Sequence, residues 1–263
     1  MRTSIPEKNH ITTLLCLLLL PAILDGQSYK FKNFGTDNRL TDKYVYTISQ
    51  DNDGFLWIGT GSGLVRFDGV DFYNVPYPDT IISRYTSVSL KDKNGNLWFG
   101  CNDGSLFYTR GNRLIKIPDL KVQSINYLLE GEDGYLYIIP QDKIILKINI
   151  NKPEEITRFY LSRDLSMTTA CFTSPDSLLI GTQENLLYCN LRKDSVAIIN
   201  RVEGIENSKV EIIRKLKNKG SCLVGTEERG LFIVDFVNGK PVLGRFRNHP
   251  EFATINVKSI IED

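Results

Sequence analysis

Residues that could perform catalysis or bind a metal ion are few in this chain. Its 263 residues contain two histidines, His10 and His249, so neither a multi-histidine metal site nor histidine-based acid–base catalysis is expected. No Cys-x-x-Cys pair is present, which disfavours a zinc knuckle or a thioredoxin-like site. The sequence therefore predicts no catalytic constellation, no bound metal and no cofactor.

Four cysteines lie beyond residue 26, and we interpret them as small buried core residues. They are Cys101, Cys171, Cys189 and Cys222. Cys171 and Cys189, 18 residues apart, are the closest pair and the one candidate for a disulfide.

Three motifs that could bind a ligand fit local structure better. Residues 51–54 are similar to a calcium loop, but they lack its Asp-x-Asp-x-Asp-Gly order and distal glutamate, so they predict a hairpin turn. The glycine-rich residues 59–63 lead into a strand rather than a helix, which argues against a phosphate loop. Trp57 and Trp98 could stack on sugar rings, but each lies in a short apolar strand, where a core residue is expected.

The charge balance argues against binding to nucleic acid. Lysine and arginine total 32 and aspartate and glutamate total 31, which gives a net charge of +1, whereas nucleic-acid-binding chains usually carry a marked basic excess. Hydrophobic residues at 41% and charged residues at 24% are ordinary values for a globular chain.

The chain begins with the pattern of an export signal, which we place at residues 1–26. Arg2 and Lys8 precede an apolar run over residues 11–24, which is shorter than the roughly 20 residues that span a bilayer. An uncleaved membrane anchor is the alternative. Export would place the remaining residues in an oxidising compartment.

A repeat with a period near 41 organises the rest of the chain. Residues 44–60 and 85–100 superpose without a gap at an offset of 41. Glycines recur at positions 59, 100, 181 and 225, and Ile139 replaces the glycine of the middle unit. A period of this length with several strands per unit is typical of a β-propeller.

Each unit is expected to form one blade of four antiparallel strands. In the first unit the strands are predicted over residues 44–50, 55–58, 64–67 and 71–75, with Asp-Gly and Asn-Gly pairs in the tight turns of the repeat. Almost no helix is expected. The residues to which we assign structural roles are Gly54, Trp57, Gly59, Gly95, Trp98, Gly100, Gly134, Gly181 and Gly225.

The sequence thus predicts an all-β fold over residues 27–263, an incomplete β-propeller. The expected blades are 44–75, 85–117, 122–160, 167–200, 209–247 and a partial sixth at 255–263. Residues 29–34 are similar to the outermost strands of the first and fifth units and are expected to close the ring. Because the sixth unit stops after its first strand, we expect the chain to be the front part of a longer protein.

Four segments carry a family resemblance. Gly-Phe-Leu-Trp-Ile-Gly-Thr at 54–60 and Gly-Leu-Val-Arg-Phe-Asp-Gly at 63–69 resemble the two-component regulator propeller repeat, and residues 257–263 match its opening. Residues 29–41 are similar to the start of the periplasmic sensor regions of Bacteroidetes-type hybrid two-component receptors.

The resemblance implies that the incomplete propeller is part of a seven-bladed ring. It also implies the periplasmic sensor region of a hybrid histidine kinase that acts in a phosphorelay and is anchored in the inner membrane. Many members of this family sense carbohydrate breakdown products and switch on polysaccharide-utilisation genes. The implied partners are a small-molecule or oligosaccharide ligand and the rest of the receptor chain, while a homodimer of the full receptor stays open. No kinase lies within these residues: Pro250 after His249 disfavours a helix that presents a phosphorylated histidine, and we expect an exposed turn residue there.

Loops that share one rim of the propeller are the predicted ligand site, because loops on a rigid scaffold carry function. The candidates lie before the first strands and between the second and third strands. They are Asn38, Arg39, Lys43, Tyr44, Arg84, Tyr85, Asn102 and Asp103. Arginine with tyrosine suits an anionic or neutral sugar. The alternative for each residue is a solvated rim position without a ligand.

Two other function classes stay open. A secreted glycan-active enzyme similar to a sialidase would need converging arginines, and the candidates are Arg39, Arg66, Arg84 and Arg110. A protein–protein interaction scaffold would need only an exposed binding patch. The sequence favours a sensor without enzymatic activity over both.

Overall fold

The structure, a computed structural model, describes residues 31–78, 84–111, 113–118, 120–217, 220–246 and 250–262. The expected export signal at 1–26 and His249 lie outside the described residues. The chain divides into two compact units, residues 1–34 and 35–263. In the first unit the described residues 31–34 form neither helix nor strand, and all described strands belong to the second unit.

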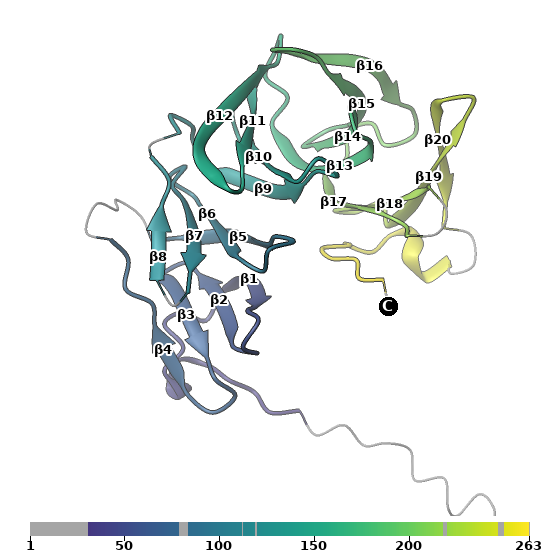
Figure 1. Ribbon diagram of the computed structural model, residues 1–263. Coiled ribbons are helices and arrows are strands. Elements are labelled where there is room, and N and C mark those ends of the chain that lie inside the picture. Colours follow the sequence, from purple (N-terminus) through teal and green to yellow (C-terminus); the bar gives the residue numbers. More distant parts are fainter. Residues whose placement is uncertain are drawn as a thin grey trace, which may run out of the picture. The chain divides into compact units, whose positions relative to one another are not determined.

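The second unit contains five four-stranded antiparallel sheets, here called blades one to five, and each is a simple meander (Figure 1). Blade one consists of β1 (Val45–Gln50), β2 (Leu56–Thr60), β3 (Gly63–Phe67) and β4 (Phe72–Asn74). Blade two consists of β5 (Thr86–Lys91), β6 (Leu97–Cys101), β7 (Leu106–Arg110) and β8 (Arg113–Lys116). Blade three consists of β9 (Ile125–Glu130), β10 (Tyr135–Pro140), β11 (Ile144–Asn149) and β12 (Lys152–Tyr160).

Blade four consists of β13 (Met167–Ser174), β14 (Ser177–Thr182), β15 (Leu186–Leu191) and β16 (Val196–Val202). Blade five consists of β17 (Val210–Lys215), β18 (Cys222–Thr226), β19 (Leu231–Val237) and β20 (Lys240–Arg245). Two short 3-10 turns, η2 (Thr36–Asn38) and η3 (Pro250–Ala253), complete the described elements. The predicted all-β propeller with four-stranded blades is therefore confirmed. No described helix has the length and apolar character needed to cross a membrane.

The first strand of each blade contacts the first strand of the next, so β1, β5, β9, β13 and β17 lie side by side (Figure 1). In every blade the pairing of the first two strands shifts register near the start of the first strand. Polar side chains then join neighbouring first strands by donating to a backbone carbonyl of the next blade. These bonds are Ser87 to Ile125 (3.1 Å), Asn126 to Met167 (2.7 Å) and Thr168 to Val210 (2.5 Å).

The recurring glycines explain how closely the blades pack. A β-carbon on Gly100 would lie 2.7 Å from Ile125 Cγ2 of the next blade and 2.8 Å from Val88 Cγ1 of its own blade. Gly59, Gly181 and Gly225 occupy the same position and would meet first-strand atoms of the next blade at 2.9 Å or less. No side chain fits there, so the period-41 glycines mark blade–blade contacts rather than turns.

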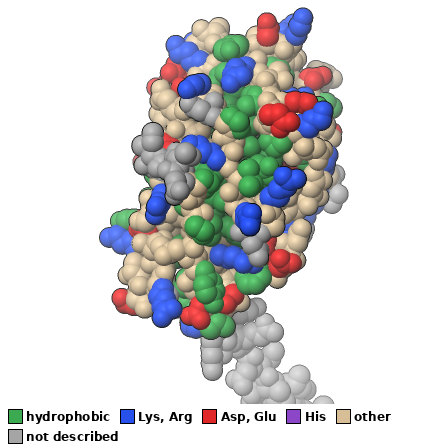
Figure 2. Space-filling model, turned by 60° about the vertical axis from the view of Figure 1, so that its left-hand side comes forward, with side chains coloured by type: hydrophobic (Ala, Val, Ile, Leu, Met, Phe, Trp, Pro, Cys, Tyr) green, Lys and Arg blue, Asp and Glu red, His purple; other side chains and the backbone are tan. Residues whose placement is uncertain are grey.

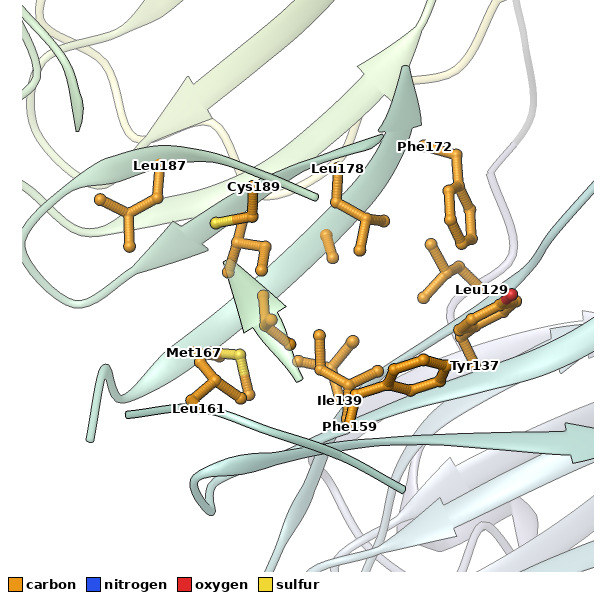
Figure 3. Packing of buried hydrophobic residues seen from close by; sticks show 14 residues of the cluster. Leu129, Tyr137, Ile139, Phe159, Leu161, Met167, Phe172, Leu178, Leu187 and Cys189 are labelled. Carbon is orange, nitrogen blue, oxygen red and sulfur yellow. The ribbon is translucent and has the colours of Figure 1, made fainter. Parts of the chain in front are cut away.

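Ile139 replaces this glycine in blade three, and the contact residue of the following blade changes with it. Where a glycine is present, the next first strand supplies Thr86, Ile125, Val210 or Val257, all branched at the β-carbon. After blade three the residue at this position is Met167, which pairs with Thr182 as Val210 pairs with Thr226. Ile139 and Met167 share one buried cluster between blades three and four (Figure 3). An unbranched methionine leaves room for the isoleucine.

Residues 255–262 dock on blade five as the expected first strand of a sixth blade would. Val257 donates its backbone N–H to the carbonyl of Thr226 at 3.0 Å and packs over Gly225, and Lys258 forms an ion pair with Glu211 of β17. The segment carries no strand hydrogen-bond ladder, because no described strand pairs with its other edge.

The expected closing strand over residues 29–34 is not formed in the described part of that range. Residues 31–34 have no strand conformation, and residues 29 and 30 lie outside the described residues. A β-strand needs a hydrogen-bonding neighbour, and no described strand pairs with residues 31–34.

Candidate ligand-binding site

The rim residues predicted to bind a ligand converge only in part. Lys43 Nζ lies 5.0 Å from the centre of the exposed Tyr44 ring. The ring of Tyr85 lies against Tyr46, with centres 4.6 Å apart, and burial together with a hydrogen bond to Tyr46 raises the pKa of Tyr85 to about 12. The carbonyl of Tyr85 accepts the Asn102 N–H at 3.0 Å. Tyr85 and Asn102 therefore meet, with Tyr46 as a neighbour that was not predicted.

The other predicted rim residues have separate surroundings. Asn38 ends η2, and Arg39 follows it with a positive φ of 71°. Asp68 raises the pKa of Tyr73 in the outermost strand β4, and the charge of Arg39 partly opposes this effect, which places Arg39 toward that strand. Arg84 is exposed at the entrance to β5, and Asp103 accepts the Ser105 N–H at 3.0 Å within its turn.

The four arginines that an enzyme similar to a sialidase would need have separate environments. Arg66 belongs to β3, and its side chain lies 3.6 Å from the ring centre of Phe55 and 3.7 Å from Asp51. Both of these residues lie in the turn between β1 and β2. Arg84 lies at the opposite end of the first strands, and Arg110 ends β7 with an exposed side chain. Hence Arg66 and Arg84 cannot act on one substrate group.

The two tryptophans are buried inside the blades. Trp57 is 2% exposed and Trp98 is fully buried. The indole N–H of Trp98 donates to Asp92 Oδ2 at 2.8 Å, and that of Trp57 donates in the same way to Asp51. Both carboxylates also accept backbone N–H groups of their turns. Their oxygens are thus occupied, and among the described residues no cluster of three His, Cys, Asp or Glu could hold a metal ion.

A cavity between the first strands brings more chemistry together than the rim does. This central cavity has a volume of about 410 Å³. It is lined by residues of β5, β9, β13 and β17 and by the segment after blade five. Four blades therefore contribute to one site, as expected when first strands surround a propeller axis.

Charged side chains stand at one end of the central cavity. Lys215 of blade five donates to Glu132 of blade three at 3.3 Å, although the two residues are 83 positions apart. Lys217 binds Glu262 through both its backbone N–H, at 3.0 Å, and its ammonium group, at 3.3 Å. Burial raises the pKa of Glu130, which accepts the Lys93 N–H at 2.9 Å.

Tyr127 and Arg214 are the side chains of the central cavity that best suit a ligand. Burial raises the pKa of Tyr127, and Arg214 is near enough to oppose this shift by its charge. Arg214 is exposed, and no ion pair among the described residues engages it. An arginine and a tyrosine thus line the central cavity, and neither is among the rim residues predicted from the loops.

The signal that could have found these residues is their position in the repeat. Tyr127 is the third residue of β9, and Arg214 lies one residue before the end of β17. Both belong to first strands, which line the axis of any propeller.

A larger groove of about 830 Å³ lies between the outermost strands β16 and β20. Two of its arginines already bind backbone carbonyls: Arg229 donates to Glu206 at 3.2 Å and Arg245 to Ala253 at 3.3 Å. Elsewhere on the surface, the face in Figure 2 shows basic, acidic and hydrophobic side chains interspersed, without a region of one charge. The central cavity is therefore the better candidate site.

Comparison with known proteins identifies the repeat and the fold. Residues 39–62 match the model of the two-component regulator propeller, which confirms the resemblance over that segment. A search of curated protein sequences finds no match.

Three solved structures share the fold. The extracellular domain assigned to a hybrid two-component system, BT3049, of B. thetaiotaomicron is 20% identical, with a TM-score of 0.68 over 82% of this chain and 32% of that chain. PorZ, a surface component of the type-IX secretion system of Porphyromonas gingivalis, is 14% identical, with a TM-score of 0.60 over 82% and 35%. Virginiamycin B lyase from Staphylococcus aureus is 12% identical, with a TM-score of 0.60 over 78% and 70%. The chain spans about a third of the first two structures.

Proposed function

We propose that this chain is part of the exported, ligand-sensing propeller of a two-component receptor, and that its ligand is carbohydrate-derived. The observation that supports the receptor is the two-component regulator repeat at residues 39–62, together with the fold shared with an extracellular domain of a hybrid two-component system. The rest of the receptor chain, its anchor in the inner membrane and its control of polysaccharide-utilisation genes belong to the same proposal.

The central cavity supports the ligand part of the proposal. Tyr127, whose ring also packs against the buried cluster between blades three and four, and Arg214 both line a space of about 410 Å³. An aromatic face suits the apolar side of a pyranose ring, and a guanidinium group binds carboxylates or several hydroxyls at once. We therefore favour a short oligosaccharide, with preference for one that carries a carboxylate.

Binding measurements on the exported region, the receptor from residue 27 up to its proposed membrane anchor, test this ligand. We expect an oligosaccharide from a panel of neutral and uronate-containing fragments to raise the melting temperature, because a ligand of the folded state stabilises it. Arg214→Ala should weaken that binding by about tenfold, the loss of roughly one good charged contact. Arg192→Ala removes an exposed arginine from the turn after β15 and is the matched control.

Equal binding by Arg214→Ala and the unaltered protein would place the ligand elsewhere than the central cavity. Failure of every glycan to bind would contradict the carbohydrate proposal. The receptor proposal has a separate test in the gene beyond codon 263, which should encode further blades and a membrane segment. Turnover of a bound glycan would instead favour the enzyme alternative.

A further inference from the structure

The four cysteines of the described residues are free thiols in two different settings. Cys101 and Cys189 are fully buried, and burial raises the pKa of each to about 12. Figure 3 shows Cys189 among hydrophobic side chains of blades three and four. Such thiols remain protonated and are poor nucleophiles.

Cys171 has the opposite setting. It lies in β13 at the wall of the central cavity and is only partly buried, so small reagents in the cavity can reach it. The neighbouring Cys222 thiol lowers the pKa of Cys171 against the opposing effect of burial, and the backbone N–H of Lys215 and the charges of Lys215 and Arg214 act in the same direction as Cys222. The Cys171 thiol itself donates to the Phe172 carbonyl at 3.6 Å. A partly exposed thiol among cationic groups is the usual setting of a reactive cysteine.

Cys222 lies beside Cys171, although the two residues belong to different blades. It is fully buried in β18 and pairs across the sheet with Lys215 of β17, the strand that contacts β13. Cys171 packs against the buried cluster between blades four and five that contains Cys222. The predicted partner of Cys171, Cys189, belongs instead to the cluster between blades three and four.

We propose that Cys171 and Cys222 form an oxidisable pair, in which Cys171 reacts first with an oxidant that enters the central cavity and Cys222 then closes a disulfide between blades four and five. With a hydroperoxide as oxidant, the Cys171 thiolate attacks one peroxide oxygen, the O–O bond breaks, and the sulfur becomes a sulfenic acid. The Cys222 thiol is buried and its pKa is raised, so it stays protonated until the sulfenic acid forms beside it. Its sulfur then attacks the Cys171 sulfur, its proton passes to the departing oxygen, the S–O bond breaks, and water leaves. In total, two thiols lose two electrons and two protons, and one peroxide is reduced.

Thiol mapping of the folded protein tests the pair. The exported region is reduced, freed of reductant, treated with hydrogen peroxide, blocked with iodoacetamide and digested for mass spectrometry. We expect one disulfide-linked peptide pair that contains Cys171 and Cys222, while Cys101 and Cys189 are recovered as free thiols. Without peroxide, iodoacetamide should label Cys171 at least tenfold faster than Cys101 or Cys189.

Variants separate the two steps. Cys222→Ser should leave Cys171 as a sulfenic acid that dimedone traps, Cys171→Ser should abolish the disulfide, and Cys189→Ser should leave it unchanged. The proposal is overturned if the folded, unaltered protein gives no 171–222 peptide, or if Cys101 and Cys189 react as fast as Cys171. Because these two outcomes are measured on the unaltered protein, a variant that fails to fold does not affect the test.

Discussion

Blades one and three reach the same local arrangement with different residues. In blade one, Asp51 at the end of β1 accepts the Trp57 indole N–H at 2.8 Å, and Arg66 on the third strand lies 3.7 Å from that carboxylate. In blade three, Asp133 accepts the Tyr137 hydroxyl at 2.8 Å and pairs with Lys147 on the third strand at 2.8 Å. Blades one and three therefore both place a carboxylate near the turn of the first hairpin, an aromatic ring on the second strand and a cation on the third strand.

The two arrangements differ in the position of the carboxylate relative to the hairpin turn. Asp51 precedes its turn, whereas Asp133 lies inside its turn, and Gly131 takes the position that corresponds to Asp51. Blade two has the same arrangement as blade one, because Asp92 accepts the Trp98 indole N–H. Asp92 is only 4% exposed. The side chain of Asp133 is 36% exposed. The same contact should therefore contribute more stability in blade two than in blade three, since solvent weakens exposed polar contacts.

The largest expected effect comes from removal of the buried carboxylate. Asp92→Ala leaves the N–H groups of Trp98, Asn94 and Asn96 without their acceptor, and we expect the free energy of unfolding to fall by about 3 kcal/mol. Asp133→Ala is the matched change in blade three and should cost about 1 kcal/mol. Urea denaturation followed by circular dichroism measures both values. Equal decreases in the free energy of unfolding of the two variants would show that burial does not make the Asp92 contact more stabilising than the Asp133 contact.

The blade–blade glycines provide the second test. Gly100→Ala places a β-carbon 2.7 Å from Ile125 Cγ2, and we expect a loss of about 2 kcal/mol from overpacking. Blade three suggests the rescue, because Ile139 and Met167 occupy the corresponding positions there and share one buried cluster. Ile125→Met in the Gly100→Ala background should restore part of the loss, while Ile125→Met alone should cost less than about 1.5 kcal/mol. The melting temperatures of the three variants decide this, and additive losses would contradict the account of Ile139.

The repeat made the blades predictable, because turn pairs such as Asp-Gly and short apolar strands are local features of the sequence. Contacts between blades were less predictable. Gly100 was visible as a recurring residue, but its reason, the side chain of Ile125 above it, depends on packing between units. The cavity residues Tyr127 and Arg214 were missed because loops, not first strands, were searched. The neighbour of Cys171 could not be found either, since Cys222 is distant in the sequence and adjacent only through the stacking of blades four and five.

The smallest effect concerns two carboxylates within blade three itself. Burial raises the pKa of Glu130, so its contribution to stability is present below about pH 4 and is lost as the pH rises through the folded-state pKa. Burial acts on Asp133 too, but hydrogen bonds from Lys147, Tyr137 and the Tyr135 N–H outweigh it and lower the pKa. The contribution of Asp133 is therefore present above about pH 4 and is lost as the pH falls through its folded-state pKa.

Neutral replacements should consequently have opposite effects at pH 7. Glu130→Gln removes a charge whose Oε1 is buried without a hydrogen-bond partner, and it should raise the free energy of unfolding by less than about 1 kcal/mol. Asp133→Asn should lower it by a similar amount. Urea denaturation at pH 7 and pH 4 measures the free energy of unfolding of each variant and of the unaltered protein. The difference between each variant and the unaltered protein should be smaller at pH 4. If both variants shift the free energy of unfolding in the same direction at pH 7, Glu130 and Asp133 do not occupy distinct environments in blade three.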